Sequence, residues 1–246
     1  MTGSLLRSRF ALPLAGVAML LIGAVSGWAF TGRSAGAASA GDFEQRVHDY
    51  IVSHPEVLVE AANALNSQGS ERQLATIAEK LVAPYPGAVL GNPNGKLTLV
   101  EFTDFACTFC RGSVADVEAL IAANPDLKVV IRELPIIAPT SPDAARWGLA
   151  AAEQGKYPAF HKAMFAAGRT DPASVEAAAR VAGLDLERAR KKVADPGITA
   201  EIAANLDYAR KLQINGTPSW VVGKRLIVGA VGREQLAQAL IAARES

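Results

Sequence analysis

The only two cysteines of this 246-residue chain, Cys107 and Cys110, lie within the stretch LVEFTDFACTFCRGSV. The residues before them, from Leu97 to Thr103, form an apolar run of the length of a buried strand. The residues after Cys107 have a helical pattern up to about Ala123. A C-x-x-C pair at the junction of a strand and a helix restricts the chain to folds that place a dithiol at a helix N-terminus.

The spacing of the two cysteines is compatible with three kinds of site. A structural zinc site needs four ligands, and the chain adds only three scattered histidines, His48, His54 and His161, with no second C-x-x-C. A structural disulfide between such close residues removes little entropy from the unfolded chain. A redox-active dithiol is typical of a C-x-x-C that opens a helix after a strand. We therefore favour the dithiol, with no metal and no cofactor.

The position of Cys107 predicts how such a dithiol works. Unpaired backbone N–H groups and the helix dipole stabilise a thiolate at the start of a helix. We expect Cys107 to be the exposed nucleophile that attacks a substrate disulfide. Cys110, one turn further along the helix, is expected to be more buried and to resolve the mixed disulfide.

Glu101 is a carboxylate inside the apolar run that precedes the cysteines. An ionised carboxylate is costly to bury, so it needs a partner, a proton or a task. One interpretation is that Glu101 reaches solvent near the end of the strand. The functional interpretation is a proton acceptor beneath the dithiol that helps to deprotonate Cys110.

The segments around the cysteines predict an α/β fold. A short strand is expected at 88–90, and longer strands at 97–103 and 127–134 flank the helix that starts at Cys107. This β-α-β unit implies a parallel pair of strands joined by a right-handed crossover.

The second half of the chain continues with helices and then a hairpin. Residues 141–213 contain several helical patterns and no convincing strand. The segments TPSWVVG and RLIVGAVG predict two strands joined at Gly223-Lys224. A closing helix is expected from Arg233 to Ala243, so the main domain spans about 88–244.

Residues 42–83 predict an all-helical N-terminal extension. Its apolar residues recur at helical spacing in three pieces, the first interrupted at Pro55. The sequence Pro84-Tyr85-Pro86-Gly87 marks the boundary with the main domain.

Residues 1–40 have the order of an export signal. Arg7 and Arg9 precede an uncharged, mostly apolar stretch at 10–30, and small residues follow. This order fits a cleaved signal peptide, with Ala38-Ser39-Ala40 as its cleavage site, or a retained N-terminal membrane anchor and linker. Because the arginines favour a cytoplasmic N-terminus in both cases, we expect a periplasmic protein, soluble after cleavage or tethered.

Two motifs carry a resemblance to a known family. The stretches LVEFTDFACTFC and GTPSWVVG resemble those of thioredoxin-fold disulfide oxidoreductases, more narrowly the DsbA-like branch. The resemblance covers about 88–244 and implies a thioredoxin-like fold with a helical insertion at 141–213. It also implies that Thr217 and Pro218 form a cis-proline loop facing the cysteines. The extension at 42–83 resembles the N-terminal helices of the ScsC and Com1-type proteins, where such helices can serve oligomerisation. This resemblance leaves two alternatives open: the extension packs on its own domain, or it mediates a homo-oligomer.

These observations predict an extracytoplasmic thiol–disulfide oxidoreductase, an oxidase or an isomerase. Its partners would be cysteine-containing exported proteins and a membrane-bound or soluble redox partner. The net charge of +1, from 25 Lys+Arg and 24 Asp+Glu, lacks the basic surplus of nucleic-acid-binding domains, so no nucleic acid is expected. The alternative is a non-catalytic, chaperone-like or surface-binding protein that retains the fold.

Overall fold

The computed structural model describes residues 40–245, apart from the side chains at positions 40, 59, 62–68 and 70. The chain divides into two compact units between Ala62 and Asn63. The predicted signal peptide or anchor lies outside the described residues. Within 40–245, no helix combines the length and apolar character needed to cross a membrane.

Two helices precede the sheet, α2 (Ala40–Ser53) and α3 (Glu56–Val82). The interruption near Pro55 is as predicted, but the second and third helical pieces form one helix of 27 residues. The last turns of α3 bury Leu74, Ile77 and Leu81 against the sheet, because these residues share one face of the helix. The unit that contains the sheet therefore begins within α3, earlier than the boundary expected at residue 88.

The sheet has five strands in the order β1-β3-β2-β4-β5. Their bounds are β1 Val89–Gly91, β2 Leu97–Thr103, β3 Leu127–Glu133, β4 Ser219–Val222 and β5 Arg225–Val228. The pair β2–β3 is parallel, as the β-α-β pattern predicts, and the other pairs are antiparallel. Val222 pairs with Arg225 across the predicted hairpin turn, where Gly223 adopts a φ of +56°.

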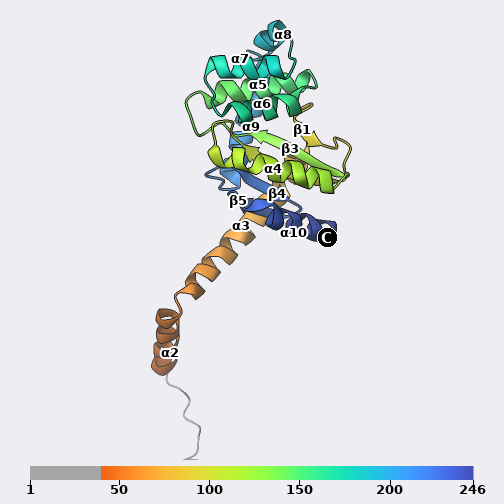
Figure 1. Cartoon of the computed structure of the whole chain (residues 1–246). Helices are drawn as coiled ribbons and strands as arrows, with labels where there is room; N and C mark the ends of the chain where they lie inside the picture. Colours follow the sequence, from red (N-terminus) through yellow and green to blue (C-terminus); the bar gives the residue numbers. More distant parts are fainter. Residues whose placement is uncertain (1–39, 246) are drawn as a thin grey trace, which may run out of the picture. The chain divides into compact units, whose positions relative to one another are not determined.

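The helices after β2 are α4 (Thr108–Ala123), α5 (Ser141–Glu153), α6 (Tyr157–Ala167), α7 (Pro172–Val181), α8 (Leu186–Lys192), α9 (Pro196–Lys211) and α10 (Gly232–Arg244). The insertion predicted at 141–213 consists of α5 to α9. Figure 1 shows α5, α6, α7 and α8 gathered as one helical layer on the β1 side of the sheet. The closing helix, α10, packs against α4 and β2.

The two faces of the sheet bury different sets of side chains, because alternate residues of a strand point to opposite faces. Leu99 and Ile131 belong to the core on the α4 face, whereas Val100 and Val130 belong to the core that includes α3. Glu101, Thr103 and Glu133 continue the odd-numbered series of β2 and β3. The sequence pattern therefore brings three buried polar residues to the face on which the cysteine helix packs.

Candidate active site

Cys107 is the N-cap of α4. Its backbone is extended, with φ −80° and ψ 118°, and its sulfur accepts a hydrogen bond from the Cys110 backbone N–H at 3.3 Å. The Cys107 N–H in turn donates to the carbonyl of Asp104 at 2.9 Å, which closes the turn between β2 and the helix. One of the orphan N–H groups in the first turn of α4 is thus directed at the sulfur, an arrangement that favours negative charge there.

Both cysteines are buried. Cys110 is 1% exposed, as expected, but Cys107 is 4% exposed, so the prediction of an exposed nucleophile is wrong for this state. The reason is the loop at Thr217, whose carbonyl oxygen accepts a hydrogen bond from the Cys107 thiol at 3.1 Å. Between the cysteines, the side chain of Phe109 is 70% exposed.

The loop before β4 brings the Thr217-Pro218 motif to the cysteines across 110 positions of sequence. The Thr217–Pro218 peptide bond is cis, as the resemblance implied. The Pro218 carbonyl accepts a hydrogen bond from the Gly229 N–H at 2.9 Å, and the Ser219 hydroxyl donates to the Gly216 carbonyl at 2.8 Å. These bonds fix the loop to the hairpin and hold the Thr217 carbonyl against the dithiol.

The environment of Cys110 both opposes and supports its ionisation. Burial raises the pKa of the Cys110 thiol well above its usual range. Interactions with the Thr217 hydroxyl, the Asp104 backbone and the Thr103 hydroxyl act in the opposite direction, because they favour the thiolate. Cys110 therefore needs a proton acceptor before it can react.

Glu101 lies in the middle of the sheet and not at a solvent-exposed end. It pairs with Ile131 of β3 on one side and Trp220 of β4 on the other, and it is 2% exposed. The interpretation that it reaches solvent is therefore wrong. Burial raises the pKa of Glu101 to about 8, and the Thr103 hydroxyl opposes part of that shift. Its Oε2 atom has no hydrogen-bond partner.

A second buried acid, Glu133, was not identified from the sequence. The Tyr157 hydroxyl donates to Glu133 Oε1 at 2.6 Å, and Glu133 Oε2 has no partner. Burial, and then the charges of Asp104 and Glu101, raise the pKa of Glu133 well above its usual range. The available signal was the one that singled out Glu101, a carboxylate at the end of a β-branched apolar run.

Asp104 was also missed, and it organises the turn before the cysteines. Its Oδ2 accepts hydrogen bonds from the backbone N–H groups of Ile136 and Ile137, both at 2.8 Å. Its Oδ1 accepts bonds from the Ala106 N–H and from the Ser141 hydroxyl. One buried carboxylate therefore joins the cysteine loop to the loop that follows β3.

His161 belongs to the core of the helical layer. It packs among Phe105, Tyr157 and Phe165, and burial lowers its pKa to about 4. Across the described part of the chain, no three His, Cys, Asp or Glu side chains form a group suited to a metal ion.

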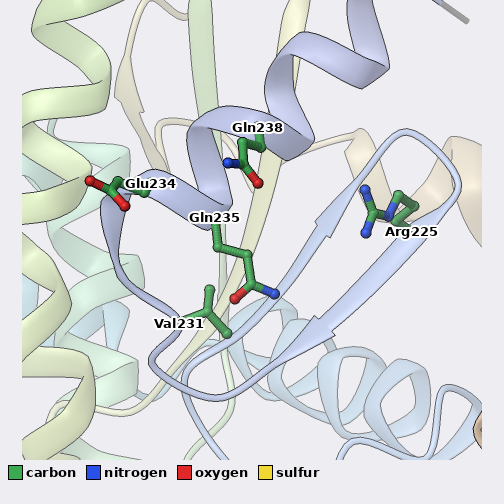
Figure 2. Close-up of a pocket in the computed structure, with 5 residues that line it drawn as sticks. All are labelled: Arg225, Val231, Glu234, Gln235 and Gln238. Atoms are coloured by element: carbon green, nitrogen blue, oxygen red, sulfur yellow. The ribbon is translucent and has the colours of Figure 1, made fainter.

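A polar pocket of about 420 Å³ lies between β5 and the start of α10 (Figure 2). Its lining residues are Arg225, Val231, Glu234, Gln235 and Gln238. Figure 2 shows the Gln235 side chain extending from α10 toward the hairpin that carries Arg225. Since neither cysteine nor Glu101 lines this pocket, the dithiol is a separate site.

Comparison with known proteins finds one family match for the N-terminal helices and another for the part that contains the sheet. The model of the DSBA-like thioredoxin domain matches residues 98–241, and that of the copper resistance protein ScsC N-terminal domain matches residues 42–71. The Na(+)/H(+) antiporter NhaA 3 of Salinispora tropica is 32% identical over 165 residues, which are 66% of this chain and 25% of that protein. The chain thus spans about a quarter (25%) of the length of such curated relatives.

Solved structures show the same fold. A thioredoxin-like oxidoreductase from Silicibacter pomeroyi DSS-3 is 42% identical, with a TM-score of 0.65, over 68% of this chain and 98% of that one. A linker-deletion mutant of Proteus mirabilis ScsC is 27% identical, with a TM-score of 0.69, over 86% of this chain and 98% of that one. The predicted thioredoxin-like fold is confirmed. Because the first family model covers more than half of the sequence, from β2 into α10, this chain belongs to the DSBA-like thioredoxin domain family.

Proposed function

We propose that this protein is an extracytoplasmic thiol–disulfide oxidoreductase that exchanges disulfides with cysteines of exported proteins. The observation that carries the proposal is the position of the Cys107 sulfur, 3.3 Å from the Cys110 N–H and 3.1 Å from the Thr217 carbonyl. Membership of the DSBA-like family supports thiol–disulfide oxidoreductase activity in general. The substrates and the location are the parts that we add.

Cys107 is the nucleophile in this proposal. Its thiolate attacks one sulfur of a substrate disulfide, so that a Cys107–substrate disulfide forms and the other substrate sulfur leaves as a thiolate. The Cys110 N–H, already bonded to Cys107 Sγ, stabilises the negative charge before the attack. The bond from the Cys107 thiol to the Thr217 carbonyl holds the sulfur in place while it is protonated.

Cys110 completes the reaction. Its thiolate attacks Cys107 Sγ, the Cys107–Cys110 disulfide forms, and the second substrate sulfur leaves reduced. Oxidation of a substrate dithiol is the same sequence in reverse. We assign Glu101 the role of accepting the Cys110 proton, and we assign Thr217 and Pro218 the role of contacting the substrate backbone beside Cys107.

The location rests on the N-terminal pattern of Arg7 and Arg9 followed by an apolar stretch. The matches to the DSBA-like and ScsC N-terminal families point to the same periplasmic location. The protein would be soluble after cleavage of the signal or tethered by it.

A homo-oligomer through residues 42–83 is part of the proposal. Within α2, Phe43, Val47 and Tyr50 are exposed large side chains at helical spacing. Such a stripe is suited to packing against the same helix of a second copy. Sedimentation of residues 41–246 tests this part, and a monomer at high concentration would contradict it.

The test of the function is reduction of insulin and reactivation of scrambled ribonuclease. We expect the protein to catalyse at least one of the two, Cys107→Ser to abolish the activity, and Gln235→Ala, in the separate pocket, to leave it unchanged. Catalysis that persists in Cys107→Ser would contradict the mechanism. If the wild type suppresses aggregation but catalyses neither reaction, the chaperone-like alternative replaces the proposal. The reduction potential of the cysteine pair then ranks oxidase against isomerase.

A further inference from the structure

Thr103 ends β2 on the face that carries Glu101 and receives Cys110. Its side chain is 0% exposed, and its hydroxyl oxygen forms no hydrogen bond in the resting geometry. A buried hydroxyl without a partner is costly, of the order of 1–3 kcal/mol. Thr103 is therefore poorly explained as a packing residue, because valine fills the same volume without that cost.

In the sequence, Thr103 lies between the acid Glu101 and the thiol Cys110. In β2 it follows Glu101 by two residues, so both side chains point to the same face, and Thr103 is the one nearer the cysteine turn. The Thr103 hydroxyl lowers the pKa of the Glu101 carboxyl and that of the Cys110 thiol, in each case against the larger effect of burial. One buried hydroxyl without a hydrogen-bond partner thus lies on the face that carries both groups that the proposed resolution step must connect.

We propose that the Thr103 hydroxyl relays the proton between the Cys110 thiol and the Glu101 carboxyl, an inference that rests on the proposed function. A hydroxyl suits this task because it both accepts and donates a proton through one oxygen. When Cys110 attacks, its proton passes to Thr103 Oγ1 while the Thr103 proton passes to the Glu101 carboxylate.

The electron pair left on Cys110 forms the bond to Cys107 Sγ. The bond between Cys107 and the substrate breaks, and the substrate sulfur leaves as a thiolate. When the protein oxidises a substrate, Cys110 is the leaving group, and the proton returns to it from neutral Glu101 by the same route.

The other titratable groups near this face are already engaged or neutral. Glu133 of β3 pairs in register with Thr103 and accepts a hydrogen bond from Tyr157 of α6, and burial raises its pKa well above the usual range. The buried ring of His161, also of α6, is neutral above pH 4 because its pKa is about 4. Both oxygens of Asp104 accept hydrogen bonds from loop residues. From α4 the face receives Cys107 and Cys110, which leaves Glu101 as the exchangeable acid.

The experiment separates the two chemical steps with Ellman's reagent. Reduced protein and limiting reagent release one nitrothiobenzoate when Cys107 attacks, and a second when Cys110 resolves the adduct. Stopped-flow absorbance follows both phases from pH 5 to 10 for the wild type, Thr103→Val and Thr103→Ser. We expect Thr103→Val to slow the second phase at pH 8 by about 10- to 100-fold, near the lower end of general acid–base effects.

The same stopped-flow measurements provide the controls. Thr103→Ser, which keeps the hydroxyl, should stay within about threefold of the wild type in both phases, and Thr103→Val should leave the first phase unchanged. The wild-type second phase should rise to an inflection near pH 8, where Glu101 ionises, and Thr103→Val should lack it. Adding Glu101→Gln to Thr103→Val should give no further loss, because both changes interrupt one route.

Failure of the proton relay and failure of the proposed function would give different results. A second phase in Thr103→Val with the wild-type rate and inflection overturns the relay but leaves the exchange activity intact. No second phase in the wild type overturns the proposed function itself. Thr103→Ala removes the same hydroxyl with a smaller side chain and must reproduce the Thr103→Val result, so the inference does not depend on how one variant folds.

Discussion

Arg132 and Glu133 are consecutive residues of β3 that point to opposite faces of the sheet, and the protein handles these two buried ionisable groups in opposite ways. They are 2% and 1% exposed. The Arg132 guanidinium donates to Glu201 at 2.7 Å, to Asn205 and to backbone carbonyls at the end of α3. The Glu133 carboxyl has one partner, the Tyr157 hydroxyl at Oε1, and its Oε2 has none.

The difference between Arg132 and Glu133 indicates two uses of buried ionisable side chains. A guanidinium with partners from several elements ties α3 and α9 to the sheet. Glu101 and Glu133 each have a carboxyl oxygen without a partner, and burial instead raises their pKa values and so favours the neutral form. A neutral acid gives little stability but can exchange a proton, and these acids lie on the face that receives the dithiol.

The largest loss in the free energy of unfolding is expected when Arg132 is replaced. Arg132→Met leaves Glu201 and three backbone carbonyls of 80–83 without their donor, and removing one partner of a buried pair costs about 3–5 kcal/mol. Urea unfolding monitored by circular dichroism measures the loss. The exchange activity per folded molecule should be unchanged. A loss below 1 kcal/mol would show that Arg132 behaves like a surface charge.

Glu101→Gln should give the next largest change in the free energy of unfolding, and this change should be stabilising. The pKa of Glu101 is raised from 4.5 to about 8, so between these values the unfolded state has released a proton that the folded state retains. Its contribution to stability therefore falls as pH rises through this window, by about 1.4 kcal/mol per pH unit. The variant should match the wild type near pH 4.5 and exceed it by about 3 kcal/mol at pH 7.

Urea unfolding of both proteins at pH 4.5, 6, 7 and 8 checks this prediction. The contribution of His161 to stability has the opposite pH dependence, because its pKa is lowered from 6.5 to about 4. His161 is present in both proteins, so its contribution cancels in the difference between their free energies of unfolding. A difference in the free energy of unfolding that does not change with pH would contradict a buried, protonated Glu101.

Tyr157→Phe should give the smallest effect. It removes the donor to Glu133 Oε1 and leaves that carboxyl with no partner, at a cost of about 1–2 kcal/mol. Tyr85→Phe is the matched control, because Tyr85 donates to Glu153 at a part-buried position where solvent can replace the bond. Thermal unfolding of the two variants compares them, and equal losses would contradict the distinction between buried and accessible carboxyls.

The sequence predicts those features of the structure that depend on a local pattern of residues. The strand before the cysteines, the hairpin at Gly223-Lys224 and the carboxyl at Glu101 follow from periodicity, turn residues and the rarity of acids in buried strands. The sequence does not predict which side chains meet across the sheet. The register of β2 and β3 places Thr103 beside Glu133, and no local pattern sets that register.

The burial of Cys107, which differs from the prediction, and the docking of α3, which the sequence left open, have the same physical origin. The burial of Cys107 results from the Thr217 loop, which is 110 positions away in sequence. The docking of α3 results from an apolar stripe whose partner surface, with Val100 and Val130, is formed only when the sheet assembles. Both are tertiary contacts of high sequence separation, which composition and spacing do not encode locally.

The central claim is that Cys107, rather than Cys110, makes the first bond to substrate, because its sulfur caps α4 and accepts the Cys110 N–H. The direct measurement is the rate at which Cys110→Ser and Cys107→Ser each form a mixed disulfide with oxidised glutathione, followed by mass spectrometry. The account predicts that Cys110→Ser, which retains Cys107, reacts at least about tenfold faster at pH 7. Equal rates, or a faster Cys107→Ser, would contradict it.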